Sequence, residues 1–143
     1  MSPKGGRLNQ AKVRELAKEE RLLLLCGHYE GVDQRVIDLY IDEEISVGDY
    51  VLTGGELPAM IVADAVSRYV SGVISQESLE KESFAGDFLE YPQYTRPRVF
   101  KGLEVPEILV SGDHGKVEEW KDKKSEEITE KLRPDLKEKR GKE

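Results

Sequence analysis

SVGDYVLTGGELP, residues 46–58, joins a short apolar segment to the start of a helix through two glycines. Residues 50–52 (YVL) combine aromatic and β-branched side chains, which predicts a buried strand. Gly54 and Gly55 leave room where a ligand or another part of the backbone must come close, and Pro58 suits the first turn of a helix. A strand, a glycine turn and a helix start in this order predict a small-molecule pocket.

The residues after Pro58 have the most regular helical pattern in the chain. Apolar side chains recur there at i, i+3 and i+4 spacing, and Arg68 lies off this face. The face consists of Ala59, Val62, Ala65, Val66, Tyr69 and Val70. We expect this helix to pack on a sheet while the glycine turn stays open.

Helices and strands alternate before the quoted stretch. Asn9 can cap a helix over about 10–20, and residues 22–26 form an unbroken apolar run that predicts a strand covered on both faces. Asp33 opens a short helix, and a second short strand follows over about 44–47. This order predicts an α/β domain with a parallel sheet and helices on both faces, in which ligands bind at the carboxyl ends of the strands.

The second half of the chain has a different pattern. Periodicity fades over residues 71–90, which indicates a linker, and prolines favour an extended segment over 91–97. Short helical pieces follow over about 106–110 and 114–132. We therefore divide the chain into a core over residues 1–74, a linker over 75–90 and a short helical extension over 91–143.

Composition narrows the classes of function. The net charge is −7, so no global basic field indicates a nucleic-acid partner. Lysine and arginine gather after residue 114, but acids nearly balance them, and we favour a solvated helix face there over a phosphate-binding one. The single cysteine, Cys26, excludes an internal disulfide and a multi-cysteine metal site. There is neither a membrane-spanning apolar run nor a signal-peptide core, so we expect a cytoplasmic protein without a membrane partner.

Two further stretches, CGHYEGVDQRVID at 26–38 and YTRP at 94–97, add specificity to SVGDYVLTGGELPA at 46–59. Together the three resemble the bacterial tRNA (guanine-N1)-methyltransferase family, the TrmD type of the knotted SPOUT methyltransferases. The resemblance implies a deep trefoil knot, a homodimer, and transfer of a methyl group from S-adenosylmethionine to N1 of the guanosine at position 37 of tRNA. It also implies that residues 1–74 bind the cofactor and that residues 91–143 bind tRNA.

The resemblance further implies which residues form the site. Cofactor contacts fall on Ser2, Pro3, Gly27, Tyr29, Glu30, Gly31, Val47, Gly48, Tyr50, Leu52, Gly54 and Gly55. Arg68 matches an arginine that stabilises charge on guanine O6. Glu82, before Ser83 and Phe84, takes the place of the aspartate that accepts the N1 proton, and is expected to reach across from the partner subunit. Glutamate there departs from the commoner pattern and lengthens the arm by one methylene.

Alternatives remain open at this point. Glu82 is one of several acids in the linker, with Glu77, Glu80 and Asp87 as solvated neighbours. His28 stands where other members often have arginine, and a loop histidine is more often structural than catalytic. No metal site is indicated, which leaves Mg²⁺ only as an ion that accompanies the RNA. The rival interpretation is a truncated or engineered knotted core, since Met1-Ser2-Pro3 matches an internal position of the family; such a core would dimerise and bind S-adenosylmethionine without catalysis.

Overall fold

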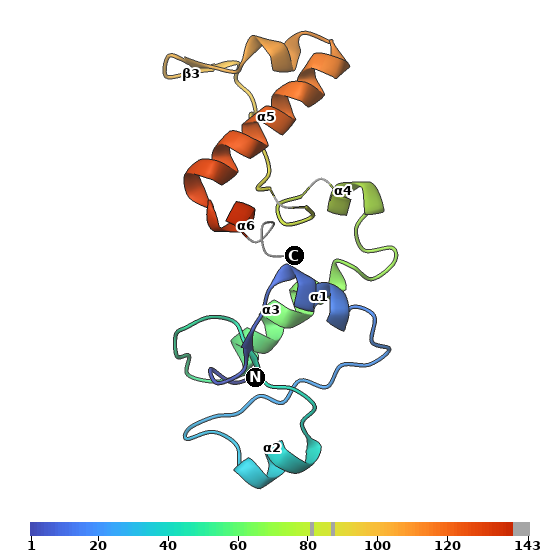
Figure 1. Ribbon diagram of the computed structural model, residues 1–143, viewed down its shortest axis with the longest axis vertical. Coiled ribbons are helices and arrows are strands. Elements are labelled where there is room, and N and C mark those ends of the chain that lie inside the picture. Colours follow the sequence, from blue (N-terminus) through green and yellow to red (C-terminus); the bar gives the residue numbers. More distant parts are fainter. Residues whose placement is uncertain (81, 87, 139–143) are drawn as a thin grey trace. The chain divides into compact units, whose positions relative to one another are not determined.

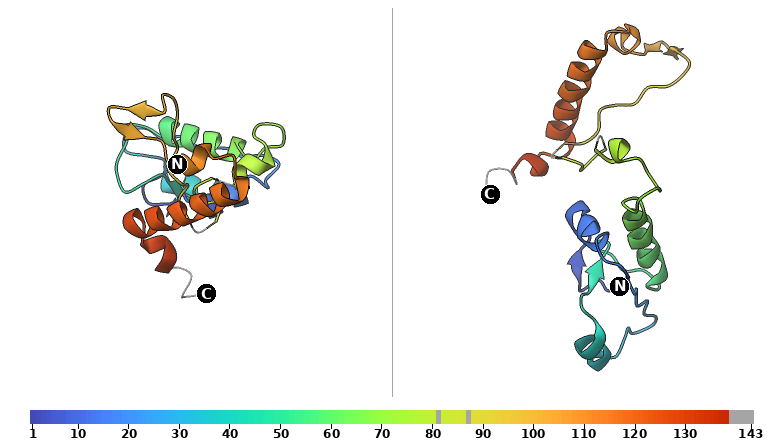
Figure 2. Two further views of the ribbon diagram at one scale, coloured as in Figure 1. Left: turned by 90° about the horizontal axis from the view of Figure 1, so that it is seen from above. Right: turned by 90° about the vertical axis from the view of Figure 1, so that its right-hand side faces the viewer.

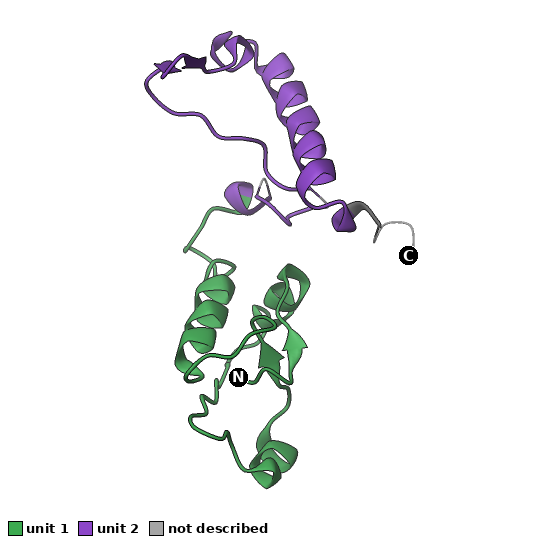
Figure 3. Cartoon of the chain, turned by 90° about the vertical axis from the view of Figure 1, so that its left-hand side faces the viewer, with its two compact units in different colours: residues 1–76 green, residues 77–143 purple. Residues whose placement is uncertain are grey.

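The computed structural model describes residues 1–80, 82–86 and 88–138 of the 143-residue chain. It divides into two compact units, Met1–Gln76 and Glu77–Glu143 (Figure 3). The elements, in chain order, are β1 (Gly6–Arg7), α1 (Gln10–Leu16), α2 (Gln34–Tyr40), β2 (Ile45–Ser46), α3 (Glu56–Ser67), α4 (Gln76–Glu80), β3 (Val99–Phe100), β4 (Leu103–Glu104), the 3₁₀ helix η1 (Glu107–Val110), α5 (His114–Leu132) and α6 (Asp135–Glu138) (Figure 1).

A short parallel sheet lies at the centre of the first unit. β1 pairs with β2 in parallel, with Gly6 opposite Ile45. The amide of Gly6 donates to the carbonyl of Glu44 (3.1 Å), and the amide of Leu8 donates to the carbonyl of Ser46 (2.7 Å). The parallel pairing and the strand expected over 44–47 are thus confirmed, although each strand is only two residues long.

The core of the first unit lies where α1 and α3 meet this sheet. Val13 of α1, Ile45 of β2 and Val62 and Val66 of α3 form one buried cluster. Figure 1 and the right-hand view of Figure 2 both show α1 beside α3, which it contacts. The helical face predicted after Pro58 therefore provides part of the core of this unit, but α3 ends at Ser67 and Val70, which was expected on the same face, is exposed.

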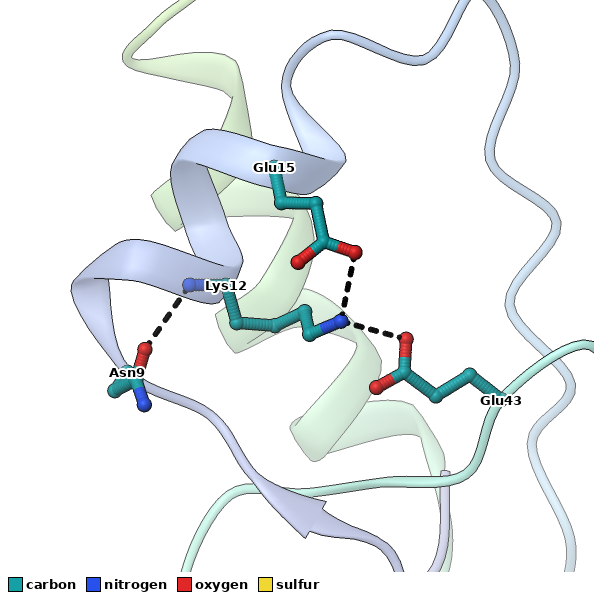
Figure 4. Close-up of polar contacts among 4 residues, drawn as sticks. All are labelled: Asn9, Lys12, Glu15 and Glu43. Carbon is teal, nitrogen blue, oxygen red and sulfur yellow. Dashed lines mark hydrogen bonds and ion pairs between the residues drawn. The ribbon is translucent and has the colours of Figure 1, made fainter.

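Hydrogen bonds explain where α1 begins and ends. Asn9 caps it, because its side-chain oxygen accepts from the amide of Lys12 (3.0 Å). Lys12 also donates to Glu15 and to Glu43, each at 2.9 Å, and so ties α1 to the segment before β2 (Figure 4). The helix ends at Leu16 rather than near residue 20, since the amides of Lys18 and Glu19 bond three residues back in a tighter final turn.

The strand predicted over residues 22–26 is not present. No strand among the described residues pairs with this segment, and Leu23 is 88% exposed while Leu22 and Leu24 pack against the core. The α-amino group of Met1 donates to the carbonyl of Leu25 (2.8 Å). The run is therefore an extended segment covered on one side, because an apolar sequence alone does not supply the neighbouring backbone that a strand needs.

The strand predicted over residues 50–52 is also wrong. The hydroxyl of Ser46 donates to the carbonyl of Gly48 (3.0 Å) and accepts from its amide (3.2 Å), so the chain turns directly after β2. Val51 is 85% exposed as a result. The helix opened by Asp33 is confirmed as α2, but none of its residues is buried.

The second unit is built around α5. The extended segment before β3 runs antiparallel to this helix. The amide of Leu89 donates to the hydroxyl of Thr129, near the end of α5. Further along the segment, the Tyr91 ring lies 5.0 Å from the Lys121 ammonium, and the Tyr94 ring packs on Trp120. Its course is visible in Figures 1 and 2. η1 and α5 confirm the helical pieces expected over 106–110 and 114–132. The linker expected over 75–90 contains a helical turn, α4, because Leu79 buries its side chain.

A two-stranded hairpin in the second unit was not predicted. β3 and β4 pair antiparallel, with Phe100 opposite Leu103. Lys101 and Gly102 between them have φ angles of 50° and 81°, the pattern of a type I′ turn. The sequence signal was the Lys101-Gly102 pair between the apolar residues Phe100 and Leu103.

Candidate functional site

A cavity of about 270 Å³ opens in the first unit. Four segments line it: the N-terminal residues 1–4, the loop over 27–32, α2 through Gln34 and Ile37, and the stretch over 44–55. All twelve residues for which the resemblance implies cofactor contacts lie on its wall: Ser2, Pro3, Gly27, Tyr29, Glu30, Gly31, Val47, Gly48, Tyr50, Leu52, Gly54 and Gly55. The folded chain therefore brings three separate stretches of sequence to one site.

Backbone contacts join two of these segments. The amide of Gly55 donates to the carbonyl of Gly27 (3.0 Å), and His28 forms an antiparallel bridge with Gly54. A Cβ atom on Gly55 would lie 2.6 Å from the Cα of Cys26. Glycine is therefore required at this position. Because the two segments approach so closely, backbone atoms form this part of the cavity wall.

The loop over 27–32 is a tight turn that displays an aromatic ring. The amide of Gly31 donates to the carbonyl of His28 (3.0 Å). Tyr29 has a φ of 56° and Gly31 a φ of 108°. Both angles are positive, a backbone conformation that favours glycine, as at Gly31. The side chain of Tyr29 is fully exposed at the cavity rim, where a flat ligand can stack on it.

Charged groups add to the site. Glu30 lines the cavity. Glu56, the first residue of α3, does not line it, but its Oε1 lies 2.5 Å from Nε2 of His28, which does. The Glu56 carboxylate accepts a hydrogen bond from its own backbone amide and a second from His28, and both lower its pKa below the usual range. The site thus offers a negative charge, backbone polar groups and an aromatic ring, which suits a small ligand with an amine and a flat ring system.

Local sequence pattern does not assign His28 or Glu56 to the site. Glu56 directly follows Gly54 and Gly55. Its position at a helix start beside the glycine turn is the sequence signal that could have placed it at the site. His28 was set aside as a structural loop histidine. Its contact with Glu56 depends on how two distant loops meet, which local pattern does not reveal.

The two residues expected to act in catalysis lie in different units. Arg68 follows the last residue of α3 as its C-cap and is half-buried, and Glu82 lies in the second unit, where its carbonyl accepts from the amide of Ala85 (3.0 Å). Neither lines the cavity of the first unit. Asp87, the acid considered beside Glu82, lies outside the described residues.

A second cavity, of about 660 Å³, lies in the second unit between the extended segment and the start of α5. Tyr91, Tyr94, Arg96, Arg98 and Lys121 line it, and none of its described lining residues is acidic. Glu118 bonds to the Lys121 ammonium (2.7 Å) and raises its pKa, and Glu107 lies 3.8 Å from the Arg98 guanidinium. Aromatic rings beside cations are the side chains that stacked, phosphate-bearing ligands need.

Most basic residues of α5 pair with nearby acids, as expected for a solvated helix face. Lys116, Lys121 and Lys124 pair with acids three residues away along the helix. Of these, only Lys121 also lines the second cavity. Most of these lysines are therefore held in ion pairs on a solvated face of α5.

Two negative findings apply to the described part of the chain. No group of three or more histidine, cysteine, aspartate or glutamate side chains there is arranged to hold a metal ion. No helix in the same residues has the length and apolar character needed to cross a bilayer.

The fold and cavity define an α/β protein with a glycine-walled small-molecule site, and sequence comparison then gives its family. The family model described as tRNA (Guanine-1)-methyltransferase TrmD matches residues 1–139, and the chain belongs to this family. Relatives named tRNA (guanine-N(1)-)-methyltransferase are 59% identical in Alkaliphilus metalliredigens over 95% of this chain and 56% of the relative. The Treponema denticola relative is 58% identical, over 97% of this chain and 57% of the relative.

The chain thus spans somewhat more than half the length of these curated relatives. Within that span more than half of the residues are identical to those of each of the two relatives.

Proposed function

We propose that the protein transfers the methyl group of S-adenosylmethionine to N1 of the guanosine at position 37 of tRNA. The observation that supports this most directly is the single cavity on which all twelve residues with implied cofactor contacts lie. Membership in the TrmD family supports the reaction. A tRNA substrate also fits the cytoplasmic location that the sequence predicts.

The residues of the cavity fit S-adenosylmethionine. Gly55 and Gly27 both line the cavity where their segments meet with no room for a Cβ on Gly55, and their neighbours offer backbone groups to an adenine ring and a ribose. The ring of Tyr29 supplies a stacking surface, and Glu30 supplies a carboxylate for the ligand's positive charges. When bound, S-adenosylmethionine would supply an electrophilic methyl group on a sulfonium sulfur.

Catalysis on the guanine needs a proton acceptor and charge stabilisation. N1 of guanine carries a proton at neutral pH, so a base must remove it as N1 attacks. We propose that the Glu82 carboxylate accepts this proton. The Arg68 guanidinium stabilises the negative charge that moves to O6. Glu82 would act from the partner subunit of a homodimer, as the family resemblance implies.

An exposed apolar face of α3 supports the homodimer. Met60 and Ile61 lie one turn after Leu57 on this helix, and all three are solvent-exposed in the single chain. Leu57→Lys should shift the protein toward monomers in light scattering, whereas Leu103→Lys on the hairpin should not. A wild-type monomer would remove the shared site from the proposal.

The second cavity supports tRNA binding by the second unit. Tyr91 and Tyr94 offer rings for unpaired bases, and Arg96 and Arg98 offer charge for phosphates. We propose that a Mg²⁺ ion used in the reaction accompanies the RNA. We further propose that the short parallel sheet belongs to a SPOUT-type trefoil knot, in keeping with the family.

Mass spectrometry of methylated tRNA tests the proposed reaction. Incubation with S-adenosylmethionine should add one methyl group to guanosine 37, at N1, and a transcript with adenosine at that position should remain unmodified. Methylation at another base, or none in a protein that is folded by circular dichroism, would contradict it.

A further inference from the structure

His28 and Glu56 connect two sides of the first cavity through their side chains. His28 lies in the loop over 27–32 and lines the cavity, while Glu56 starts α3 directly after the glycine pair. Nε2 of His28 is 2.5 Å from Oε1 of Glu56. Both side chains are about half exposed, 53% and 55%, so they exchange protons with solvent.

The contact is set in a joint that has little free space. The backbone of His28 forms a bridge with Gly54, and a Cβ on Gly54 would lie 2.7 Å from the His28 ring and 2.5 Å from the Glu56 carboxylate. A change in the contact between His28 and Glu56 would therefore displace the loop that carries Tyr29 and the glycine turn. Both segments form the wall of the cavity.

The charge of the pair depends on one proton. Glu56 has a lowered pKa, because its own backbone amide and His28 both donate to the carboxylate, so it stays ionised through the neutral range. Histidine is the side chain whose charge ordinarily changes between about pH 5 and 8. Protonation of His28 turns the contact into a charge-assisted hydrogen bond, and deprotonation leaves a neutral imidazole beside the carboxylate.

We propose that His28 and Glu56 form a proton-dependent latch that holds the loop over 27–32 against the start of α3 and makes cofactor affinity depend on pH. His28 is a positioning residue in this account. The proposal rests on the proposed function, because S-adenosylmethionine is the ligand whose affinity is measured. Linkage gives the sign: because the protonated form of the latch holds the loop, binding should weaken as pH rises and should take up a proton.

Other ionisable groups surround the latch and must be separated from it. Tyr29 is the neighbouring ring, 6.0 Å from that of His28. The remaining ionisable groups on the cavity wall are the α-amino group of Met1, Lys4, Glu30, Glu44 and Tyr50. The test must therefore change His28 while leaving these groups intact.

Calorimetric titration with S-adenosylhomocysteine, the demethylated product, tests the latch from about pH 6 to about pH 8.5. The wild-type protein should bind about two- to fivefold more weakly at the high end, the range expected for a half-exposed ion pair. His28→Arg keeps a positive charge at every pH, so it should bind as wild type does at low pH and lose the pH dependence. Glu56→Gln should bind weakly and without pH dependence. His114→Gln, in the second unit, removes the chain's other histidine and should behave as wild type.

The outcomes are distinct. A wild-type protein with flat affinity across this range, or a His28→Arg variant that keeps the wild-type slope, overturns the latch and leaves the proposed function standing. A wild-type protein that binds neither S-adenosylmethionine nor its product at any pH overturns the proposed function itself. Should His28→Arg fail to fold by circular dichroism, Glu56→Gln decides alone, since wild-type affinity and slope in that variant refute the latch.

Discussion

The amide of Gly55 donates a hydrogen bond to the carbonyl oxygen of Gly27 across 3.0 Å and so joins two glycine turns that lie far apart in the sequence. The joint has no room for a side chain, because a Cβ on Gly55 would meet the backbone of Cys26. The wall of the first cavity is therefore determined by backbone packing. The core that holds these turns in place must persist for the cavity to exist.

We expect the core to depend strongly on Val62. This side chain is fully buried between α3 and the sheet, so Val62→Ala should lower the free energy of unfolding by about 2–3 kcal/mol through lost burial and a residual cavity. Val70→Ala makes the same change at a half-exposed position beyond the end of α3 and should cost less than about 1 kcal/mol. Urea unfolding followed by circular dichroism measures both, and equal losses would contradict the assigned core.

Thr129 should have a similar importance in the second unit. Its buried hydroxyl accepts from the amide of Leu89 (2.8 Å) and donates to the carbonyl of Ser125 (2.7 Å). Thr129→Val keeps the shape but leaves the Leu89 amide without its partner, which should cost about 1–3 kcal/mol. Thr95→Val, on the exposed part of the extended segment, is the control, and thermal melts that coincide for the two variants would refute the role of Thr129.

The proposed base can be tested separately from cofactor binding. Glu82→Gln should lower the rate of methyl transfer by about 10² or more while leaving the affinity for S-adenosylmethionine nearly unchanged, because only the proton acceptor is lost. Glu77→Gln, an acid of α4, is the matched control. Single-turnover kinetics with wild-type rates in Glu82→Gln would remove Glu82 from the mechanism.

RNA binding by the second cavity has a built-in reporter. Trp120 is the only tryptophan in the sequence, and its ring lies 6.3 Å from that of Tyr94, which lines the cavity. Bound tRNA should change Trp120 fluorescence. Arg96→Gln should weaken binding and reduce the salt dependence of the affinity by about one phosphate contact. Lys101→Gln on the hairpin should change neither, and an Arg96→Gln variant with the wild-type salt slope would argue against this surface.

Much of the fold follows from local pattern. Asn9 and Asp33 cap the helices they were expected to cap, and the apolar face with Val62 and Val66 packs in the core. These features depend on residues within one or two helical turns. The strands predicted at 22–26 and 50–52 are absent from the structure, since apolar content does not specify whether a neighbouring strand is available.

The candidate site was predictable in part and for a different reason. The glycine stretches were visible as local signals, but the resemblance to a family supplied the ligand. The contact between His28 and Glu56 arises only when the two loops meet, and sequence pattern carries no information on that distance. The resemblance implied tRNA binding by residues 91–143, but local pattern did not predict the cation-rich second cavity, because paired charges on α5 dominate the composition around Lys121.

We expect the glycine-walled cavity of the first unit to bind S-adenosylmethionine, and calorimetric titration of wild type, Gly55→Ala and Gly6→Ala measures this binding. A Cβ on Gly55 would lie 2.6 Å from backbone, whereas one on Gly6 meets no atom within 4 Å. Wild type and Gly6→Ala should show saturable one-site binding, and a Gly55→Ala variant that remains folded should lose it. Binding of equal affinity in folded Gly55→Ala would show that the ligand binds outside this cavity.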